Sequence, residues 1–541
     1  FHWADWLVFA LMLAVSAAAG LWHYKGAQKS STEDYLLGGK SMTLLPVSAS
    51  LVASFISGVT ILGTPAEIYN FGTQYWITII SILFSGLVVA LVYAPVFVAL
   101  GLNSVYEFSF FCSIWNDVVL YQSIVVYVPA LALKLITVSG IDVHLIGIIV
   151  CLICMFYTVL GGIKAVVWTD ALQVGIMVAG VLTVSILGTY QIGAAEIWKR
   201  SLDANRIEFL NFDPSPYTRH TVWTVLIGSW LYSTAYISVN QTMVQRYRSL
   251  KDLKTSKLSL AIFTISIMLF ISLCCWCGLV LVAWWSPPKC DPRASGLITA
   301  DDQLLPAYVM EIAKHLHGVP GLFIAAIFGA ALSTLSVGFN STSVVVLEDF
   351  VKGCFGMKPS DRCSFIFVKC LVVLLGCIAI GLLFLVEKLG GVLVITGSLA
   401  AIAAGTSFGV FTLGMFFPWV NSKGAFMGAI VGFVIAGWAS LGANWSIGAG
   451  LLVPKKLPVL FSHCQGNISE SFLKQFDRPK LNKNVFFFSE DDVFPLYRLS
   501  YHWFTGLGTL IVIIVGNFIS WWTGPTDVSS IDKKLLSPMI H

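Results

Sequence analysis

The chain has 541 residues, of which 57% are hydrophobic and 11% are charged. A soluble globular protein carries roughly 25% charged residues, so this composition excludes the soluble and the disordered classes of protein. The net charge of +4 is spread thinly along the chain, which excludes the dense basic surface that binds nucleic acid. We therefore expect an all-α polytopic membrane protein.

Thirteen apolar runs are long enough, or nearly so, to cross about 30 Å of hydrocarbon. They lie near residues 6–24, 44–70, 75–98, 118–136, 142–160, 169–190, 222–240, 258–284, 319–345, 364–386, 391–417, 424–443 and 502–522. The first run has no small-residue cleavage site after it, so we interpret it as a membrane span and not as a signal peptide.

Lysine and arginine set the predicted orientation, because cytoplasmic loops carry the excess of positive charge. The densest basic patch follows the seventh run and consists of Arg246, Arg248, Lys251, Lys254 and Lys257. With that loop in the cytoplasm, the N-terminus is extracellular, the C-terminus is cytoplasmic, and 444–501 becomes a large extracellular loop. We expect a multi-pass protein of the plasma membrane.

Cysteines and one glycosylation sequon agree with this orientation. Cys290 and Cys464 fall in the two large outer loops, where an oxidising exterior permits a disulfide. Two free loop thiols are the alternative. Asn467 opens an Asn-Ile-Ser sequon on the same side, and we expect it to carry sugar.

The sequence gives little support for an enzyme. Gly39-Lys40-Ser41 looks like the end of a phosphate-binding loop, but Asp34 stands where that loop requires a glycine. No HExxH motif is present, and the nine histidines are scattered. We therefore expect a protein that is not an enzyme.

The second run combines Gly58, Gly63 and Pro65 with several hydroxyl residues, which predicts an interrupted membrane helix. Broken backbone at membrane depth is tolerated only beside a cavity or within protein. Its free carbonyl groups can coordinate a cation there. A packing seam of small residues between helices is the alternative.

Two further places could hold a cation. In the ninth run, Ser333 and Thr334 present adjacent hydroxyl groups one turn after Ala330, although both hydroxyls could simply bond back to the preceding turn. Asp170 opens the sixth run. It could hold a further cation, or it could merely stabilise the N-terminus of its helix.

Several motifs along the chain resemble the sodium/solute symporters, in the branch that holds the monocarboxylate, multivitamin and iodide transporters. The matching segments are 34–40 (DYLLGGK), 62–72 (LGTPAEIYNFG), 157–173 (YTVLGGIKAVVWTDALQ), 219–221 (RHT), 239–247 (VNQTMVQRY), 320–325 (PGLFIA) and 413–418 (LGMFFP).

The resemblance implies an inverted-repeat (5+5), LeuT-like symporter fold with 13 transmembrane helices in a single domain, 1–541. Spans 2–6, about 44–190, would form the first repeat, and spans 7–11, about 222–417, the inverted one. Spans 1, 12 and 13 would be peripheral. Spans 2 and 7 would be the broken helices.

The resemblance also implies a sodium site. Its ligands would be the carbonyl groups of Ala53, Ile56 and Ala330 and the hydroxyl groups of Ser333 and Thr334. Ser57 and Asp170 are candidates for a further sodium site.

The substrate would contact span 2 and span 7, at the positions Phe55, Ser57, Thr60, Ser233, Ile237 and Gln241. Thr60 favours a small monocarboxylate such as lactate, pyruvate, a short-chain fatty acid or nicotinate. Ser233 and Ile237 stand where the family usually has Trp and Tyr, while Tyr232 and Tyr236 are close but shifted in register. Span 11 departs as well, since 400–409 (AAIAAGTSFG) stands where the family has an FGMVGGPLLG-like run. Two walls of the pocket have therefore changed.

No buried Lys or Arg is expected to pair with the substrate carboxylate, so binding of the anion would depend strictly on bound Na⁺.

The chain also departs from the family at 106–127, where about eleven residues are missing, roughly three helical turns. The implied function is Na⁺-coupled uptake of a small organic anion by alternating access. Uptake of biotin, pantothenate or iodide is one alternative, and a non-transporting solute or Na⁺ sensor on the same fold is another. Na⁺, the organic anion and the lipid bilayer are the expected partners.

Overall fold

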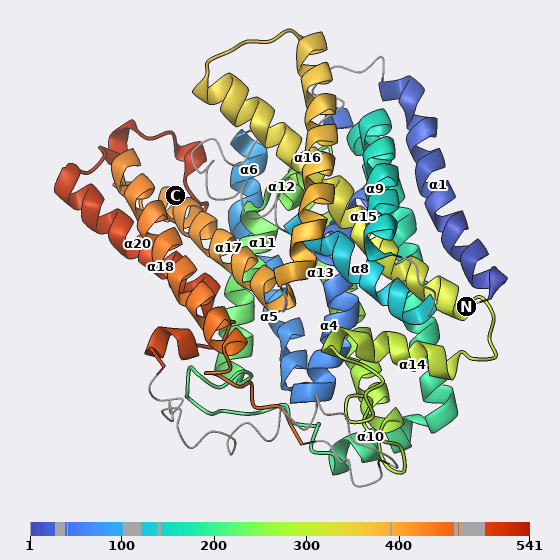
Figure 1. Ribbon diagram of the computed structural model, residues 1–541. Helices are drawn as coiled ribbons and strands as arrows, with labels where there is room; N and C mark the ends of the chain where they lie inside the picture. Colours follow the sequence, from blue (N-terminus) through green and yellow to red (C-terminus); the bar gives the residue numbers. More distant parts are fainter. Residues whose placement is uncertain are drawn as a thin grey trace.

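The computed structural model describes residues 2–27, 38–40, 42–100, 121–137, 142–389, 392–458, 464 and 493–540. Within these residues the chain is a bundle of helices (Figure 1). Eight helices there are long and apolar enough to cross a membrane, and one bent pair adds a ninth. Shorter apolar helices lie at Gln122–Lys134 and Ala401–Phe416. The prediction of an all-helical membrane protein is confirmed, and the number thirteen stays a prediction.

Short π-helical and 3₁₀ segments lie between some of the α-helices. Their bounds are α1 Trp3–Ala27, α3 Leu44–Phe55, α4 Gly58–Phe71, α5 Thr78–Val88, α6 Ala94–Leu100, α8 Tyr121–Thr137, α9 Val143–Ile192, α10 Ala194–Asp203, α11 Ser229–Val239, α12 Gln241–Arg248, α13 Leu253–Trp284, α14 Leu304–Ile312, α15 Val319–Val345, α16 Asp361–Leu389, α17 Val392–Phe416, α18 Ser422–Gly448 and α20 Trp503–Thr523.

One helix, α9, contains both of the apolar runs that were predicted near 142–160 and 169–190. It is 50 residues long and carries a kink at Gly162, whose φ of 57° lies in the left-handed region. Glycine adopts this conformation without the steric cost that a Cβ atom would bring. A loop between these two runs is therefore absent, and the chain turns at a single glycine inside the helix.

The centre of the bundle is α15, which packs along α9 (Figure 1). Nearly all of its residues are buried, so other helices surround it almost completely. On one flank α1 contacts both α9 and α15, and α18 packs against α20 on the other. Asp5 joins α1 to the N-terminus of α15, because its Oδ1 accepts hydrogen bonds from the backbone N–H groups of Gly318 and Gly321. A carboxylate is favourable at a helix N-terminus.

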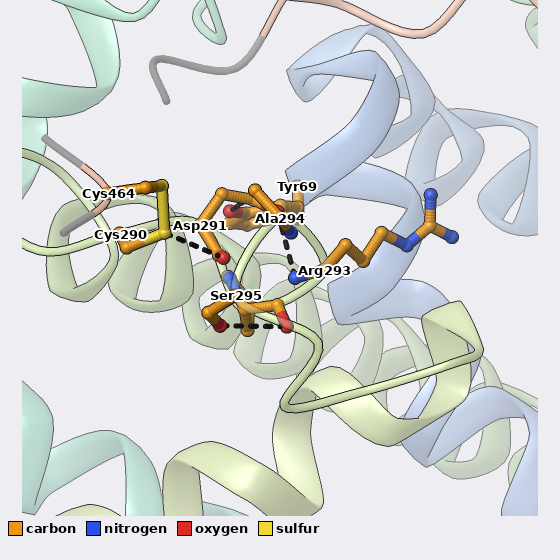
Figure 2. The surroundings of a disulfide bond; sticks show 8 residues. Tyr69, Cys290, Asp291, Arg293, Ala294, Ser295 and Cys464 are labelled. Atoms are coloured by element: carbon orange, nitrogen blue, oxygen red, sulfur yellow. Dashed lines mark hydrogen bonds between the residues drawn. A yellow bond between two sulfur atoms is a disulfide. The ribbon is translucent and has the colours of Figure 1, made fainter. Parts of the chain in front are cut away.

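A disulfide joins Cys290 to Cys464, across 174 residues of sequence, and lies close to α4 (Figure 2). The residue after Cys290 continues the connection, because Asp291 Oδ2 accepts a 2.6 Å hydrogen bond from the hydroxyl of Tyr69 in α4. We call this end of the bundle the disulfide end. The predicted glycosylation site Asn467 lies outside the described residues, as do residues 106–120 of the shortened segment.

Replacing Cys290 and Cys464 together by serine should lower the free energy of unfolding by about 2–5 kcal/mol, because the bridge closes a long loop in the unfolded chain. The check is the melting temperature of the purified protein in detergent. Cys363→Ser is the matched control, since Cys363 is an exposed free thiol. Equal melting temperatures for the double variant and the control would contradict the expectation.

Candidate sodium and solute site

The second span is interrupted between α3 and α4, which meet at an angle of 58°. Ile56 is extended, with φ −86° and ψ 118°, and Ser57 is extended as well. Pro65 lies within α4 without breaking it. The interruption therefore comes just before Gly58, and the helix continues through the proline.

This break frees backbone carbonyl groups from the helical ladder. The N–H of Ser57, which would bond to Ala53 O in a continuous helix, instead lies 3.4 Å from Thr60 Oγ1. The N–H of Thr60 donates to Ser57 O and not to Ile56 O. The carbonyl groups of Ala53 and Ile56 thus lie at the C-terminal end of α3, where the helix dipole favours a cation.

The hydroxyl groups of α15 lie against this break. Ser333 Oγ donates to Ala53 O at 3.1 Å and to Ala330 O at 2.9 Å. Thr334 Oγ1 donates to Ala330 O at 2.8 Å. The main-chain and side-chain oxygens of four residues therefore meet between α3 and α15, and Ile56 is fully buried beside them. Hard cations such as Na⁺ prefer oxygen ligands of this kind.

Asp170 is fully buried, and its partner is an arginine. Arg246 Nη2 lies 3.5 Å from Asp170 Oδ2, and neither side chain is exposed. Ser50 of α3 joins them, because its hydroxyl donates to Asp170 Oδ2 at 2.5 Å and accepts from Arg246 Nε at 2.6 Å. The three residues connect α9, α12 and α3. The proposed cation role of Asp170 remains a prediction, and this ion pair provides a structural role for the same carboxylate.

The placement of Arg246 corrects one expectation from the sequence. The basic patch after the seventh run is not simply a loop, because α11 ends at Val239 and α12 begins again at Gln241. Asn240 separates the two helices in an extended conformation and caps α12, with its Oδ1 accepting from the N–H of Thr242. Arg246 lies in α12 and is buried, with the carboxylate of Asp170 as its partner. The expectation that no buried Lys or Arg pairs with the substrate carboxylate stays a prediction.

A cavity of about 70 Å³ lies beside the break. One water molecule needs roughly 10–15 Å³ of such space, so the cavity has room for a few water molecules or one small solute. Fourteen residues line it: Ser54, Gln122, Tyr232, Ala235, Tyr236, Val239, Asn240, Thr242, Thr334, Val337, Gly338, Thr342, Ala403 and Ala404. Its wall includes Ser54 of α3 and no residue of α4, which leads from the break to the disulfide end, so the cavity lies on the other side of the break.

The predicted substrate residues of span 7 do not line this cavity. Ser233 and Ile237 are buried in packing, with 2% and 0% of their surfaces exposed. Tyr232 and Tyr236 line it instead, four residues apart on one helix face. Gln241 is also buried away from the cavity wall.

The span 2 residues lie at the break itself. Phe55 is half-buried, and its ring packs against the ring of Tyr236 at 5.5 Å between centroids. Tyr236 in turn donates to Ser54 O at 3.0 Å. Ser57 is the N-cap residue of α4, and Thr60 Oγ1 accepts from its N–H, so the Thr60 side chain has a structural role that the sequence did not suggest.

At the disulfide end an ion pair joins α4 to the segment before α11. Arg219 donates to both carboxylate oxygens of Glu67, at 2.6 and 3.1 Å, and its guanidinium lies over the rings of Phe71 and Tyr501. His220 Nε2 lies 3.1 Å from Glu67 Oε1. Burial lowers the pKa of His220, although Glu67 acts in the opposite direction. Arg219 therefore carries the positive charge of this cluster at neutral pH.

Arg219→Met should destabilise the protein by about 1–3 kcal/mol, because it leaves the Glu67 carboxylate largely buried without its bidentate partner. Arg219→Lys should recover only part of that loss, since an ammonium group cannot donate in the same forked geometry. The melting temperature in detergent tests both variants. Arg362→Met, at an exposed position, is the control. A melting temperature for Arg219→Met equal to that of the control would refute the expectation.

This bundle of apolar helices, with an interruption between α3 and α4, is typical of membrane transporters. Residues 35–432 match the Sodium:solute symporter family, so the chain belongs to that family, as its motifs predicted. The protein is a transporter and not an enzyme, and Na⁺ is its co-transported ion.

Characterised relatives cover nearly the whole chain. Sodium-coupled monocarboxylate transporter 1 of Mus musculus is 37% identical over 96% of this chain and 87% of its own length. Sodium-coupled monocarboxylate transporter 2 of Mus musculus is 35% identical over 99% of this chain and 86% of its own length. The sodium-dependent multivitamin transporter of Oryctolagus cuniculus is 34% identical over 97% and 83%.

A solved structure shows the same fold. The substrate-bound, outward-open state of a Na⁺-coupled sialic acid symporter superimposes with a TM-score of 0.75, covering 97% of this chain and 99% of that one. Sequence identity to it is 21%, so the likeness concerns the fold alone.

Proposed function

We propose that this symporter carries a small monocarboxylate together with Na⁺ into the cell by alternating access. The observation that carries the proposal is the meeting of Ala53 O, Ala330 O, Ser333 Oγ and Thr334 Oγ1 between α3 and α15. The sodium ligands would be these four groups with the carbonyl of Ile56. Two of the relatives named above are monocarboxylate transporters, which favours that class of anion.

The proposed architecture is a 5+5 inverted repeat within thirteen spans. The interruption of α3–α4 at Ile56 and Ser57, and that of α11–α12 at Asn240, supports broken second and seventh spans. The half-helices α3 and α12 contact each other. In an inverted repeat the first half of one broken span and the second half of the other lie on the same side of the membrane, so this contact agrees with the proposal. We place the N-terminus and the disulfide end outside the cell and the C-terminus in the cytoplasm.

The ion stoichiometry determines how far the solute can be concentrated. A tenfold Na⁺ gradient supplies about 1.4 kcal/mol, and a membrane potential of about −60 mV adds about 1.4 kcal/mol per charge. One Na⁺ with one monoanion is electroneutral and supports roughly tenfold accumulation. Two Na⁺ would make transport electrogenic. They would support roughly thousandfold accumulation, the second site being the role proposed for Asp170 or Ser57.

The test is two-electrode voltage clamp with parallel isotope uptake in oocytes, after surface expression is verified. Lactate, butyrate, nicotinate, biotin, pantothenate and iodide are applied with and without Na⁺. Uptake of a monocarboxylate that requires Na⁺ is the expected result. Uptake that persists fully in choline medium, or Na⁺-dependent uptake of only the vitamins or iodide, would overturn the proposal.

A further inference from the structure

The cavity beside the break contains a buried amide whose oxygen has no partner. Gln122 of α8 is 3% exposed, and its Oε1 makes no hydrogen bond with any of the residues that the structure describes. An unpaired polar atom in a buried position costs free energy, so such an atom in a cavity wall indicates that something polar completes it. The two ends of a Gln amide are assigned and not observed, so the group can offer either its oxygen or its N–H donors.

The chain makes room for this amide at one position of α15. A Cβ atom on Gly338 would collide with Nε2 of Gln122, so only glycine permits the amide to lie where it does. Both residues line the cavity. The pair therefore links α8 to α15 and places the amide in the cavity wall together with Thr334.

The other groups in the wall are neutral. Asn240 Oδ1 accepts from the N–H and the hydroxyl of Thr242, so the amide nitrogen of Asn240 is what this residue can offer a ligand, and it is a donor. The remaining wall includes several small apolar side chains, namely Ala235, Val239, Val337, Ala403 and Ala404. None of the fourteen lining residues carries a charge. Neutral donors beside short apolar walls suit a carboxylate with a short hydrocarbon chain.

A carboxylate in this cavity would need a positive charge nearby, and bound Na⁺ would supply it. Thr334 belongs both to the cavity wall and to the proposed sodium ligands, and Ser54 of the wall is adjacent to Ala53. An anion in the cavity would therefore lie close to bound Na⁺, in surroundings where opposite charges attract more strongly than in water.

We propose that this cavity is an inner subsite for a short-chain carboxylate, on the cytoplasmic side of the break, and that the Gln122 amide hydrogen-bonds to the carboxylate there. The inference rests on the proposed function, because it assumes the same class of solute. It adds a second position for that solute, distinct from Phe55, Ser57 and Thr60, and assigns Gln122 as a residue that recognises it on the cytoplasmic side.

A kinetic test uses the difference between the two faces of the protein. Gln122→Leu should raise the intracellular half-saturation concentration for butyrate efflux by about tenfold, the loss of one hydrogen bond to a charged group. It should leave the extracellular half-saturation concentration for uptake unchanged. Gly338→Ala should act in the same direction because it displaces the amide. Gly175→Ala is the matched control, since a Cβ there meets open space. Equal intracellular values for Gln122→Leu and wild type would overturn the assignment.

A second test does not depend on transport. Ala404→Cys places a thiol in the cavity wall, and its modification by a methanethiosulfonate reagent is followed in inside-out membranes, with the chain lacking this cysteine as background. Butyrate should slow the modification, and the uncharged butyramide should not. The same modification rate with and without butyrate, or equal protection by both compounds, would overturn the subsite. Protection by butyrate in a protein that transports no monocarboxylate would uphold the subsite while refuting the proposed function.

Discussion

Replacing Ser333 and Thr334 together by alanine is expected to abolish Na⁺-coupled uptake while leaving the protein folded. The double variant removes both hydroxyl oxygens that meet the carbonyl groups of Ala53 and Ala330 at the break. An oxygen ligand on a cation makes a charge–dipole contact, to which we assign about 1.5–3 kcal/mol, the value of a hydrogen bond to a charged group. The loss of both ligands should therefore raise the half-saturation concentration for Na⁺ by at least about a hundredfold. Isotope uptake measured against Na⁺ concentration gives this value.

The control is Ser343→Ala on the same helix. Ser343 is buried and its hydroxyl only bonds back to Phe339 O, so it reproduces the chemical change without touching the break. The control should keep the wild-type Na⁺ dependence. If the double variant reaches the cell surface and retains that dependence as well, the sodium site is elsewhere.

Arg246→Met is expected to destabilise the protein more than any other single substitution considered above. It leaves the Asp170 carboxylate at 0% exposure without its guanidinium partner. Removing one member of a buried ion pair typically costs about 3–5 kcal/mol. The melting temperature in detergent and the amount of protein at the cell surface should both fall sharply, whereas Lys251→Met, at an exposed position, should change neither.

A second variant separates the structural role of Asp170 from its proposed cation role. Adding Asp170→Asn to Arg246→Met removes the uncompensated charge and should recover much of the lost stability. A different pattern would count against a purely structural pair: wild-type stability in Arg246→Met, combined with fewer Na⁺ ions moved per solute in Asp170→Asn. That result would assign Asp170 to a further sodium site.

Composition and local patterns predicted the membrane architecture and the interruption of the second span. Gly58 and the neighbouring hydroxyls indicated a break, and the structure has it at Ile56 and Ser57. Pro65 was a weaker signal, because a proline whose freed carbonyl is accommodated by neighbouring helices can remain within a membrane helix.

Side-chain contacts between residues far apart in the chain could not be predicted from the sequence. Arg246 was assigned to a basic loop because the count of positive charges does not show what a side chain contacts. Asn240 was a usable signal, since asparagine favours the cap of a new helix and the residues after it continue with helical spacing. Gln122 enters the cavity only through the packing of α8 on α15, a contact that no local pattern encodes.

Register explains the difference at span 7. The resemblance selected Ser233 and Ile237 by their distance from Asn240, but in this chain those side chains face the packed side of α11. Tyr232 and Tyr236 lie about 100° away around the helix and face the cavity. A shift of one position in the aromatic residues is enough to exchange the two faces.

The central claim is that Na⁺ drives concentrative entry of a small monocarboxylate. The most direct measurement is the accumulation of radiolabelled butyrate in proteoliposomes that contain the purified protein under an imposed inward Na⁺ gradient. We predict a transient accumulation above the external concentration, which disappears when an ionophore collapses the gradient. Butyrate that only equilibrates across the membrane, equally with and without the Na⁺ gradient, would contradict the account.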